Sequence, residues 1–248
     1  MMTFLRQIFF NIAFYGYTVL TCILYTPLLW LPRPYFLKLL QFYFETVHQI
    51  EKVVLGLDFV VRGAENIPKE GPFLVGAKHH SAYETMKLHL LFKDPAIIMK
   101  KELMQIPLWG WHAQKARMIG IDRSSREVAL TSLVDGAKRI QSEGRPLVIF
   151  PQGTRVAIDE SVSKRPYKGG IARMYEATHQ VVLPLAMNSG LYWKRNAFFK
   201  KPGTVIFEIF PPIPAGLPPN DMMRQLQDTV ENASARLVAE AQAAGGKE

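Results

Sequence analysis

The sequence predicts an α/β protein with a mostly parallel central sheet flanked by helices, preceded by an N-terminal membrane-associating helical segment. Three observations predict this fold class. Short β-branched runs alternate with helical periodicity after residue 56, and strand, helix and strand follow one another between residues 116 and 150. The chain also carries no charged side chain from residue 7 to residue 32. Strand–helix–strand order is typical of parallel sheets, and about 20 apolar residues can span a bilayer.

The apolar start continues into a second helical pattern over residues 35–57. Apolar side chains such as Phe36, Leu40, Phe44 and Val47 recur there at helical spacing, with charged residues between them. This pattern is typical of an amphipathic helix at a membrane interface. We therefore predict that residues 1–54 form a membrane-anchoring helical segment and residues 55–248 a separate α/β domain.

Two membrane arrangements fit this segment, and a third reading needs no membrane. The chain could cross the bilayer once, or two helices could lie in one leaflet. The third reading is a helical hairpin buried in a soluble protein. Only Arg6 precedes the uncharged stretch, whereas Arg33 and Lys38 follow it. Basic residues favour the cytoplasmic side, so we expect the protein at the cell membrane with its catalytic domain on the cytoplasmic side.

The net charge of the 248-residue chain limits its partners. A formal charge of +9 favours nucleic acid, an anionic membrane or a small anionic substrate. The aromatic residues cluster in the apolar start and not among the arginines, so we expect no nucleic-acid partner. Cys22 is the only cysteine, which excludes an intrachain disulfide and a CxxC metal pair.

Seven strands and three helices are predicted in the body of the chain. The strands have β-branched or continuously apolar sequences and cover residues 58–63, 72–78, 95–100, 116–121, 146–150, 181–187 and 204–210. The helices have apolar residues at helical spacing and cover residues 82–92, 126–144 and the stretch that begins at Asp221.

Polar clusters directly follow three of these strands. They are KHHSAYE (78–84), IDRSSR (121–126) and PQGTR (151–155). Because ligand-binding residues of such sheets lie at the carboxyl ends of the strands, we expect the three clusters to meet at one site. The arginines at positions 123, 126 and 155 have the fork geometry that suits phosphate oxygens.

The first cluster supports a structural and a catalytic interpretation. Ser81 and Glu84 have the S-x-x-E spacing of a capping box, in which both histidines are incidental. Glu84 could instead orient one imidazole, which would act as a general base. The spacing alone does not choose between His79 and His80.

The ordered set of clusters resembles the glycerolipid acyltransferase family that includes 1-acylglycerol-3-phosphate O-acyltransferases. The H-x4-D block of that family is similar to His79 through Glu84. The three other blocks are similar to GIDR (120–123), FPQGTR (150–155) and VLPLA (182–186), and the segment KKELMQIPLWGW (100–111) is also typical. The resemblance covers roughly residues 57–190 and implies a glycerol-3-phosphate acyltransferase-like fold.

The resemblance implies how the site would work. His79 would remove a proton from the acceptor hydroxyl, and Glu84 would hold the imidazole. Arg123 and Arg155 would bind the acceptor phosphate, Gly153 and Thr154 would shape that site, and Lys101 would assist the anion. The acyl donor would be a thioester of coenzyme A or acyl carrier protein, with no metal and no other cofactor. The product would be phosphatidic acid, formed from a lysophospholipid acceptor at an anionic membrane.

Three residues depart from the family pattern. Glu84 stands where the family has aspartate, Gln152 replaces the glutamate of FPEGTR, and Lys78 stands where asparagine often precedes the histidine. Gln152 keeps a second acceptor open, such as a lyso-ornithine lipid. A lysine directed at the imidazole would lower its pKa, whereas an outward lysine would not. A catalytically silent protein that binds anionic lipid remains an alternative, and a serine hydrolase is disfavoured because no G-x-S-x-G motif occurs.

Overall fold

The central sheet has seven strands within the residues that the computed structural model describes, 2–122 and 125–245. The strands lie in the order β1-β7-β6-β2-β5-β3-β4. Their bounds are Leu57–Arg62 (β1), Leu74–Ala77 (β2), Ala96–Lys100 (β3), Ile119–Ile121 (β4), Leu147–Ile149 (β5), Val182–Met187 (β6) and Gly203–Ile209 (β7). Every neighbouring pair is parallel except β6 and β7, which are antiparallel. The predicted α/β fold with a mostly parallel sheet is confirmed.

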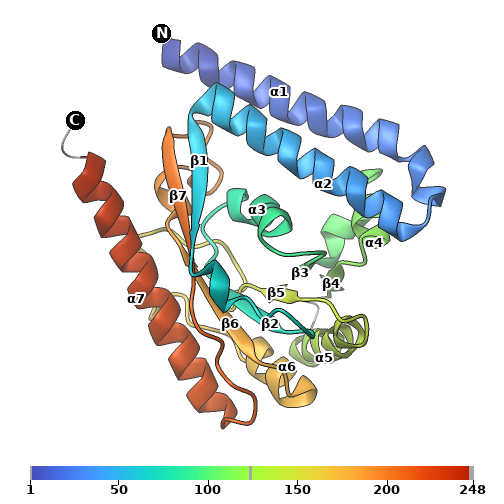
Figure 1. Cartoon of the computed structure of the whole chain (residues 1–248), viewed down its shortest axis with the longest axis vertical. Coiled ribbons are helices and arrows are strands. Elements are labelled where there is room, and N and C mark those ends of the chain that lie inside the picture. Colours follow the sequence, from blue (N-terminus) through green and yellow to red (C-terminus); the bar gives the residue numbers. More distant parts are fainter. Residues whose placement is uncertain (1, 123–124, 246–248) are drawn as a thin grey trace.

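Helices cover both faces of this sheet (Figure 1). Their bounds are Met2–Tyr25 (α1), Arg33–Ile50 (α2), Tyr83–Leu91 (α3), Trp109–Lys115 (α4), Arg126–Ser142 (α5), Gly170–Thr178 (α6) and Pro219–Gly245 (α7). Buried side chains of α1 to α4 pack in one core on one face, and those of α5 to α7 form a second core on the other. Adjacent residues of β2 show the division, because Leu74 packs in the second core and Val75 in the first.

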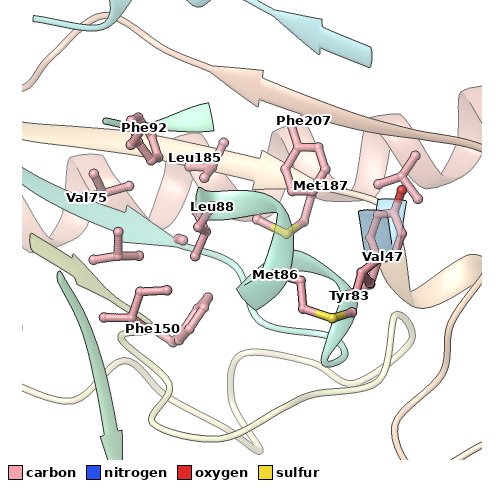
Figure 2. Packing of buried hydrophobic residues seen from close by; sticks show 14 of the residues in the cluster. Val47, Val75, Tyr83, Met86, Leu88, Phe92, Phe150, Leu185, Met187 and Phe207 are labelled. Carbon is pink, nitrogen blue, oxygen red and sulfur yellow. The ribbon is translucent and has the colours of Figure 1, made fainter. Parts of the chain in front are cut away.

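Helix α3 is the element that positions the site, and it packs directly on the sheet. Tyr83 and Leu88 are fully buried, and Figure 2 shows them beside Leu185 and Phe207 of the neighbouring strands. Burying side chains of this size contributes roughly 1.5–3 kcal/mol each. The first turn of α3 is therefore held against the carboxyl end of β2.

The N-terminal segment forms two antiparallel helices that lie along the same face as α3 (Figure 1). Residues 4–25 of α1 are long and apolar enough to cross a membrane. Phe10 on α1 is fully buried, with its ring 5.6 Å from that of Trp193. Phe9, Ile12 and Leu20 on the same helix are exposed. Helix α1 therefore has one face in the protein core and one apolar face outside it.

Helix α2 continues as a π-helical turn, Glu51–Leu55, before Gly56 turns the chain into β1 with a φ of 68°. Phe36 of α2 belongs to the same buried cluster as the sheet residue Leu185. The predicted division between residues 54 and 55 stays a prediction, and the helical structure itself extends to Leu55.

Two ion pairs attach α2 to the region of α3. Near its start, Arg33 makes two hydrogen bonds of 2.7 Å with Asp94, which follows α3. At its end, Glu51 pairs with Lys87 of α3, and both side chains are fully buried. The Arg33–Asp94 pair is partly exposed and the Glu51–Lys87 pair is buried, and together they join both ends of α2 to the α3 region.

Candidate active site

The entry to α3 combines the two interpretations of the first polar cluster. The Ser81 hydroxyl accepts a hydrogen bond from the amide of Tyr83 (3.0 Å), and Glu84 Oε1 accepts from the amides of His80 and Ser81 (2.6 Å each). These bonds satisfy amide donors that a helix start leaves free. The same Oε1 atom lies 2.8 Å from Nδ1 of His79. Glu84 therefore caps the helix and orients an imidazole at once, and the imidazole is that of His79.

The His79 ring is fixed on two sides and open on a third. It stacks on Phe150 with a centroid distance of 3.9 Å and an interplanar angle of 16°. Nδ1 donates to Glu84, and Nε2 makes no hydrogen bond to any described residue. This arrangement leaves a basic nitrogen available for a substrate hydroxyl, with a carboxylate behind the ring to stabilise the imidazolium.

Glu84 is fully buried, yet it stays ionised because donors surround it. Its second oxygen, Oε2, accepts hydrogen bonds from the hydroxyls of Ser81 (2.9 Å) and Ser189 (2.8 Å). Burial alone would raise the pKa of Glu84, but the hydrogen bond and charge of His79, the charge of His80 and the amide of Ser81 lower that pKa to about 2. Glu84 is therefore a carboxylate at every physiological pH.

His80 has a structural place. Its side chain is buried, and Nδ1 donates to the carbonyl of Val156 over 2.9 Å. Burial lowers the pKa of His80, partly offset by the nearby carboxylate of Glu84. The His80 side chain therefore ties the end of β2 to the segment after PQGTR.

His79 lines a cavity of about 1250 Å³. Its apolar lining reaches the N-terminal helices through Phe14, Leu40 and Phe44, and Trp109 and Met118 also line it. Its cationic lining residues are Lys100, Arg126, Arg155, Lys168, Arg173 and Arg195. No aspartate or glutamate lines the cavity among the described residues. Such a space suits a molecule with a long apolar chain and an anionic head.

The structure brings most of the predicted site residues to this cavity. His79, Gly153, Thr154 and Arg155 line it, and Glu84 lies behind His79. Gly153 has a φ of 69°, a left-handed conformation that favours glycine. The predicted residue Arg123 lies outside the described residues.

Lys101 is placed differently from the expectation. Its ammonium lies 3.1 Å from the carboxylate of Asp122, the side chain is largely exposed, and Lys101 is not among the lining residues. The preceding residue, Lys100, lines the cavity instead. Lys100 is the last residue of β3, whereas Lys101 begins the 3-10 helix Lys101–Gln105, so the chain changes direction between these neighbours.

Lys78 and Gln152, which depart from the family pattern as Glu84 does, each have a structural explanation. The Lys78 ammonium lies 2.6 Å from the Glu231 carboxylate on α7, which also accepts from the hydroxyl of Tyr167. The Lys78 side chain thus lies on the α7 face of the sheet, where it pairs with Glu231. Gln152 is buried, and its side-chain amide donates to the carbonyl of Arg165 over 3.0 Å, a bond that a glutamate could not make.

Sequence reasoning missed several residues of the site. Lys168, Arg173 and Arg195 lie outside the three polar clusters and line the cavity from later segments of the chain. Ser189, which donates to Glu84, lies 105 residues further along the chain. A signal for Lys168 existed in the pair of glycines that follows it, because Gly169 and Gly170 begin α6 and a helix start attracts anions.

Comparison with known proteins identifies the class to which this fold and site belong. Residues 58–188 match the family model named Acyltransferase, so the chain belongs to the acyltransferase family. The match includes His79, Glu84 and the segment from Phe150 to Arg155, and it ends just after β6.

Individual relatives narrow the similarity to one group of acyltransferases. The chain is 36% identical over 162 residues to a 1-acyl-sn-glycerol-3-phosphate acyltransferase of Pseudomonas aeruginosa, covering 65% of this chain and 62% of the relative. It is 29% identical over 169 residues to the protein of that name from Saccharomyces cerevisiae, covering 67% and 55%. The aligned region thus spans less than two thirds of the length of these relatives.

A solved structure has the same fold over nearly the whole chain. The crystal structure of the 1-acyl-sn-glycerophosphate (LPA) acyltransferase PlsC from Thermotoga maritima superposes with a TM-score of 0.73. The alignment covers 95% of both chains at 23% sequence identity. The shared fold therefore includes the N-terminal helices as well as the sheet.

Proposed function

We propose that this protein transfers an acyl chain from a thioester to the free hydroxyl of 1-acylglycerol 3-phosphate and so forms phosphatidic acid. The observation that carries the proposal is the His79–Glu84 pair, joined at 2.8 Å, with His79 lining the same cavity as Arg155 and Thr154. The names of the relatives, which are 1-acyl-sn-glycerol-3-phosphate acyltransferases, point to the same reaction.

The proposed reaction uses His79 as a general base without a covalent enzyme intermediate. Nε2 takes the proton as the acceptor oxygen attacks the thioester carbonyl, and Glu84 stabilises the imidazolium. When the carbon–sulfur bond breaks, the imidazolium returns the proton to the leaving thiolate. An ester and a free thiol result, and His79 is neutral again.

The charge of the cavity favours a phosphate over other headgroups. Six cations and no carboxylate line it within the described residues, so an anionic headgroup gains from every charged side chain nearby. A lyso-ornithine headgroup, our second acceptor, is zwitterionic, so the attraction of its carboxylate to these cations is offset by the repulsion of its ammonium. The acyl donor, whether a thioester of coenzyme A or of acyl carrier protein, would place its acyl chain against the apolar lining residues of the cavity.

The exposed apolar face of α1 supports attachment to a membrane. Phe9, Ile12 and Leu20 face outward from the protein, and Trp30 lies exposed in the turn between α1 and α2. Trp side chains favour the headgroup layer. We propose that this face inserts into the cell membrane, either as a span or within one leaflet, and that the α/β body faces the cytoplasm.

Mass spectrometry of reaction products tests the proposed activity. Purified protein would be supplied with acyl-coenzyme A or acyl carrier protein thioesters and with 1-acylglycerol 3-phosphate, lyso-ornithine lipid or lysophosphatidylcholine. We expect phosphatidic acid as the main product and no product from His79→Ala with an unchanged unfolding temperature. Acylation of another acceptor alone would replace the proposed substrate. No acylation of any acceptor, or equal activity of His79→Ala, would refute the proposal.

A further inference from the structure

Lys168 crosses the glycine at the centre of the PQGTR segment. A Cβ atom built on Gly153 would lie 3.1 Å from Nζ of Lys168 and 3.3 Å from Cδ and Cε. The missing side chain of Gly153 therefore makes room for the lysine, which runs along the cavity wall. The contact places the Lys168 ammonium against Gly153, the residue two positions before Arg155, and Lys168 and Arg155 both line the cavity.

The Lys168 ammonium has no hydrogen-bond or ion-pair partner among the described residues, and no carboxylate lines this cavity. An exposed lysine is usually just solvated, but Lys168 lies at a concave wall together with other cations. Among the described residues, the Arg155 side chain donates only to the neutral amide oxygen of Asn196 (3.2 Å). Uncompensated cations that converge on one cavity attract an anion.

Two hydrogen bonds hold the loop that presents Lys168. The amide of Lys168 donates to the carbonyl of Pro151 (2.9 Å), and the Gln152 side chain donates to the carbonyl of Arg165 (3.0 Å). Both bonds join the beginning of the 151–168 loop to its end. A glutamate at position 152 would place a carboxylate against the Arg165 carbonyl, so two acceptors would face each other. The side-chain amide of Gln152 therefore holds the end of the loop, residues 165–168, close to Gly153.

We propose that Lys168 binds the phosphate of the acceptor beside Arg155, and that Gln152 is the positioning residue that holds Lys168 over Gly153. This inference rests on the proposed function for the identity of the headgroup. Lysine contributes a compact charge with three donors, which complements the planar fork of arginine around one phosphate. The glutamine that departs from the family pattern thereby has a role in acceptor binding.

The test uses binding of glycerol 3-phosphate to the full-length protein, measured by isothermal titration calorimetry, together with steady-state kinetics. We expect Lys168→Gln to weaken glycerol 3-phosphate binding about tenfold and to raise KM for 1-acylglycerol 3-phosphate similarly, because a charge-assisted contact is worth about a factor of ten or more. Its kcat should stay within about threefold of the wild type, and Lys168→Arg should restore part of the affinity.

Lys164→Gln is the matched control, because Lys164 lies exposed in the same loop and does not line the cavity. It removes the same charge and should leave binding unchanged. Equal weakening by Lys164→Gln, or unchanged binding by Lys168→Gln, would overturn the role of Lys168. The role of Lys168 would also be overturned if the wild-type protein bound glycerol 3-phosphate no more tightly than Lys168→Gln. If binding depends on Lys168 but no acceptor is acylated, the proposed activity fails while the anion site stands.

Two variants test Gln152. Gln152→Met removes the donor without adding charge, and Gln152→Glu removes it and adds a carboxylate. We expect both to raise KM severalfold with little change in kcat, and Gln152→Glu to have the larger effect. An unchanged KM in Gln152→Met would show that the amide does not position Lys168.

Discussion

Helix α3 is associated with two fully buried glutamates, one within the helix and one packed against it. Their carboxylates have different hydrogen-bond partners. Glu84 lies in the first turn and accepts hydrogen bonds from His79, two backbone amides and two serine hydroxyls. Glu51 reaches α3 from the end of α2 and pairs with Lys87, while its Oε1 atom has no hydrogen bond to any described residue. Both oxygens of Glu84 accept hydrogen bonds, whereas Glu51 has the Lys87 ammonium as its close partner, with Nδ1 of His48 3.9 Å from its Oε2 atom.

The difference separates a chemical role from a structural one. In the proposed reaction, the fixed donors around Glu84 would keep it ionised while the charge on His79 changes, as a general base requires of its supporting carboxylate. Lys87 offers Glu51 a permanent partner, although burial lowers the pKa of Lys87 and the charge of Glu51 offsets only part of that effect. Breaking the first arrangement should affect catalysis, and breaking the second should affect folding.

The largest effect is expected from Glu84→Gln. An amide can no longer accept from Nδ1 of His79 with a full negative charge, so we expect kcat to fall by about 10³–10⁴-fold. KM should change little, because Glu84 does not line the cavity. Steady-state kinetics at a temperature well below unfolding provides the measurement.

Ser189→Ala is the control for that variant, since it removes one hydrogen bond to Oε2 and leaves the His79 contact intact. Its kcat should stay within about tenfold of the wild type, in line with the loss of one hydrogen bond. A Glu84→Gln protein as active as Ser189→Ala would contradict the chemical role of Glu84.

The next effect is on stability. Lys87→Met leaves the Glu51 charge buried without its partner, so the free energy of unfolding should fall by about 3–5 kcal/mol. The double variant Glu51→Leu/Lys87→Met removes both charges and should recover most of that loss. Urea unfolding in detergent measures both values. A single variant that costs under about 1 kcal/mol, or a double variant no more stable than the single one, would refute the structural role.

The smallest expected effect appears in acid. The pKa of Glu84 is lowered from 4.5 to about 2, so its contribution is fully present above pH 4.5 and is lost as the pH falls towards 2. The shift corresponds to about 3 kcal/mol at most. Unfolding free energies at pH 5, 4 and 3 should therefore fall more steeply for the wild type than for Glu84→Gln. Parallel curves would show that Glu84 does not have a lowered pKa.

The convergence of His79, Gly153, Thr154 and Arg155 could be predicted from sequence because each follows a strand of a parallel sheet. The carboxyl ends of such strands share one edge, so local patterns were enough. The seven strands and the helix over residues 126–142 were also predictable from their periodicity. The last helix begins at Pro219, two residues before the predicted start, a difference typical of helix boundaries.

The remaining features depend on contacts between distant segments. Lys168 reaches the cavity because the 151–168 loop closes on itself. Ser189 meets Glu84 because the strands that precede them, β6 and β2, are neighbours in the sheet although they lie far apart in the sequence. The antiparallel pairing of β7 and the position of β1 beside it follow from strand order, which no local pattern encodes. Lys101 pairs with Asp122 because it comes just after the last residue of β3. The sequence does not define the end of that strand to within one residue, so it could not show which of Lys100 and Lys101 lines the cavity.

The position of β1 also constrains how the chain can be made. Its partner β7 begins about 140 residues later, with Leu57 paired to Gly203. During synthesis the two N-terminal helices and β1 therefore emerge long before the strand that completes that edge of the sheet. Pairings of such long sequence separation form slowly. The nascent protein can reach a lipid surface through its first two helices while the binding cavity does not yet exist, so attachment would precede catalytic competence.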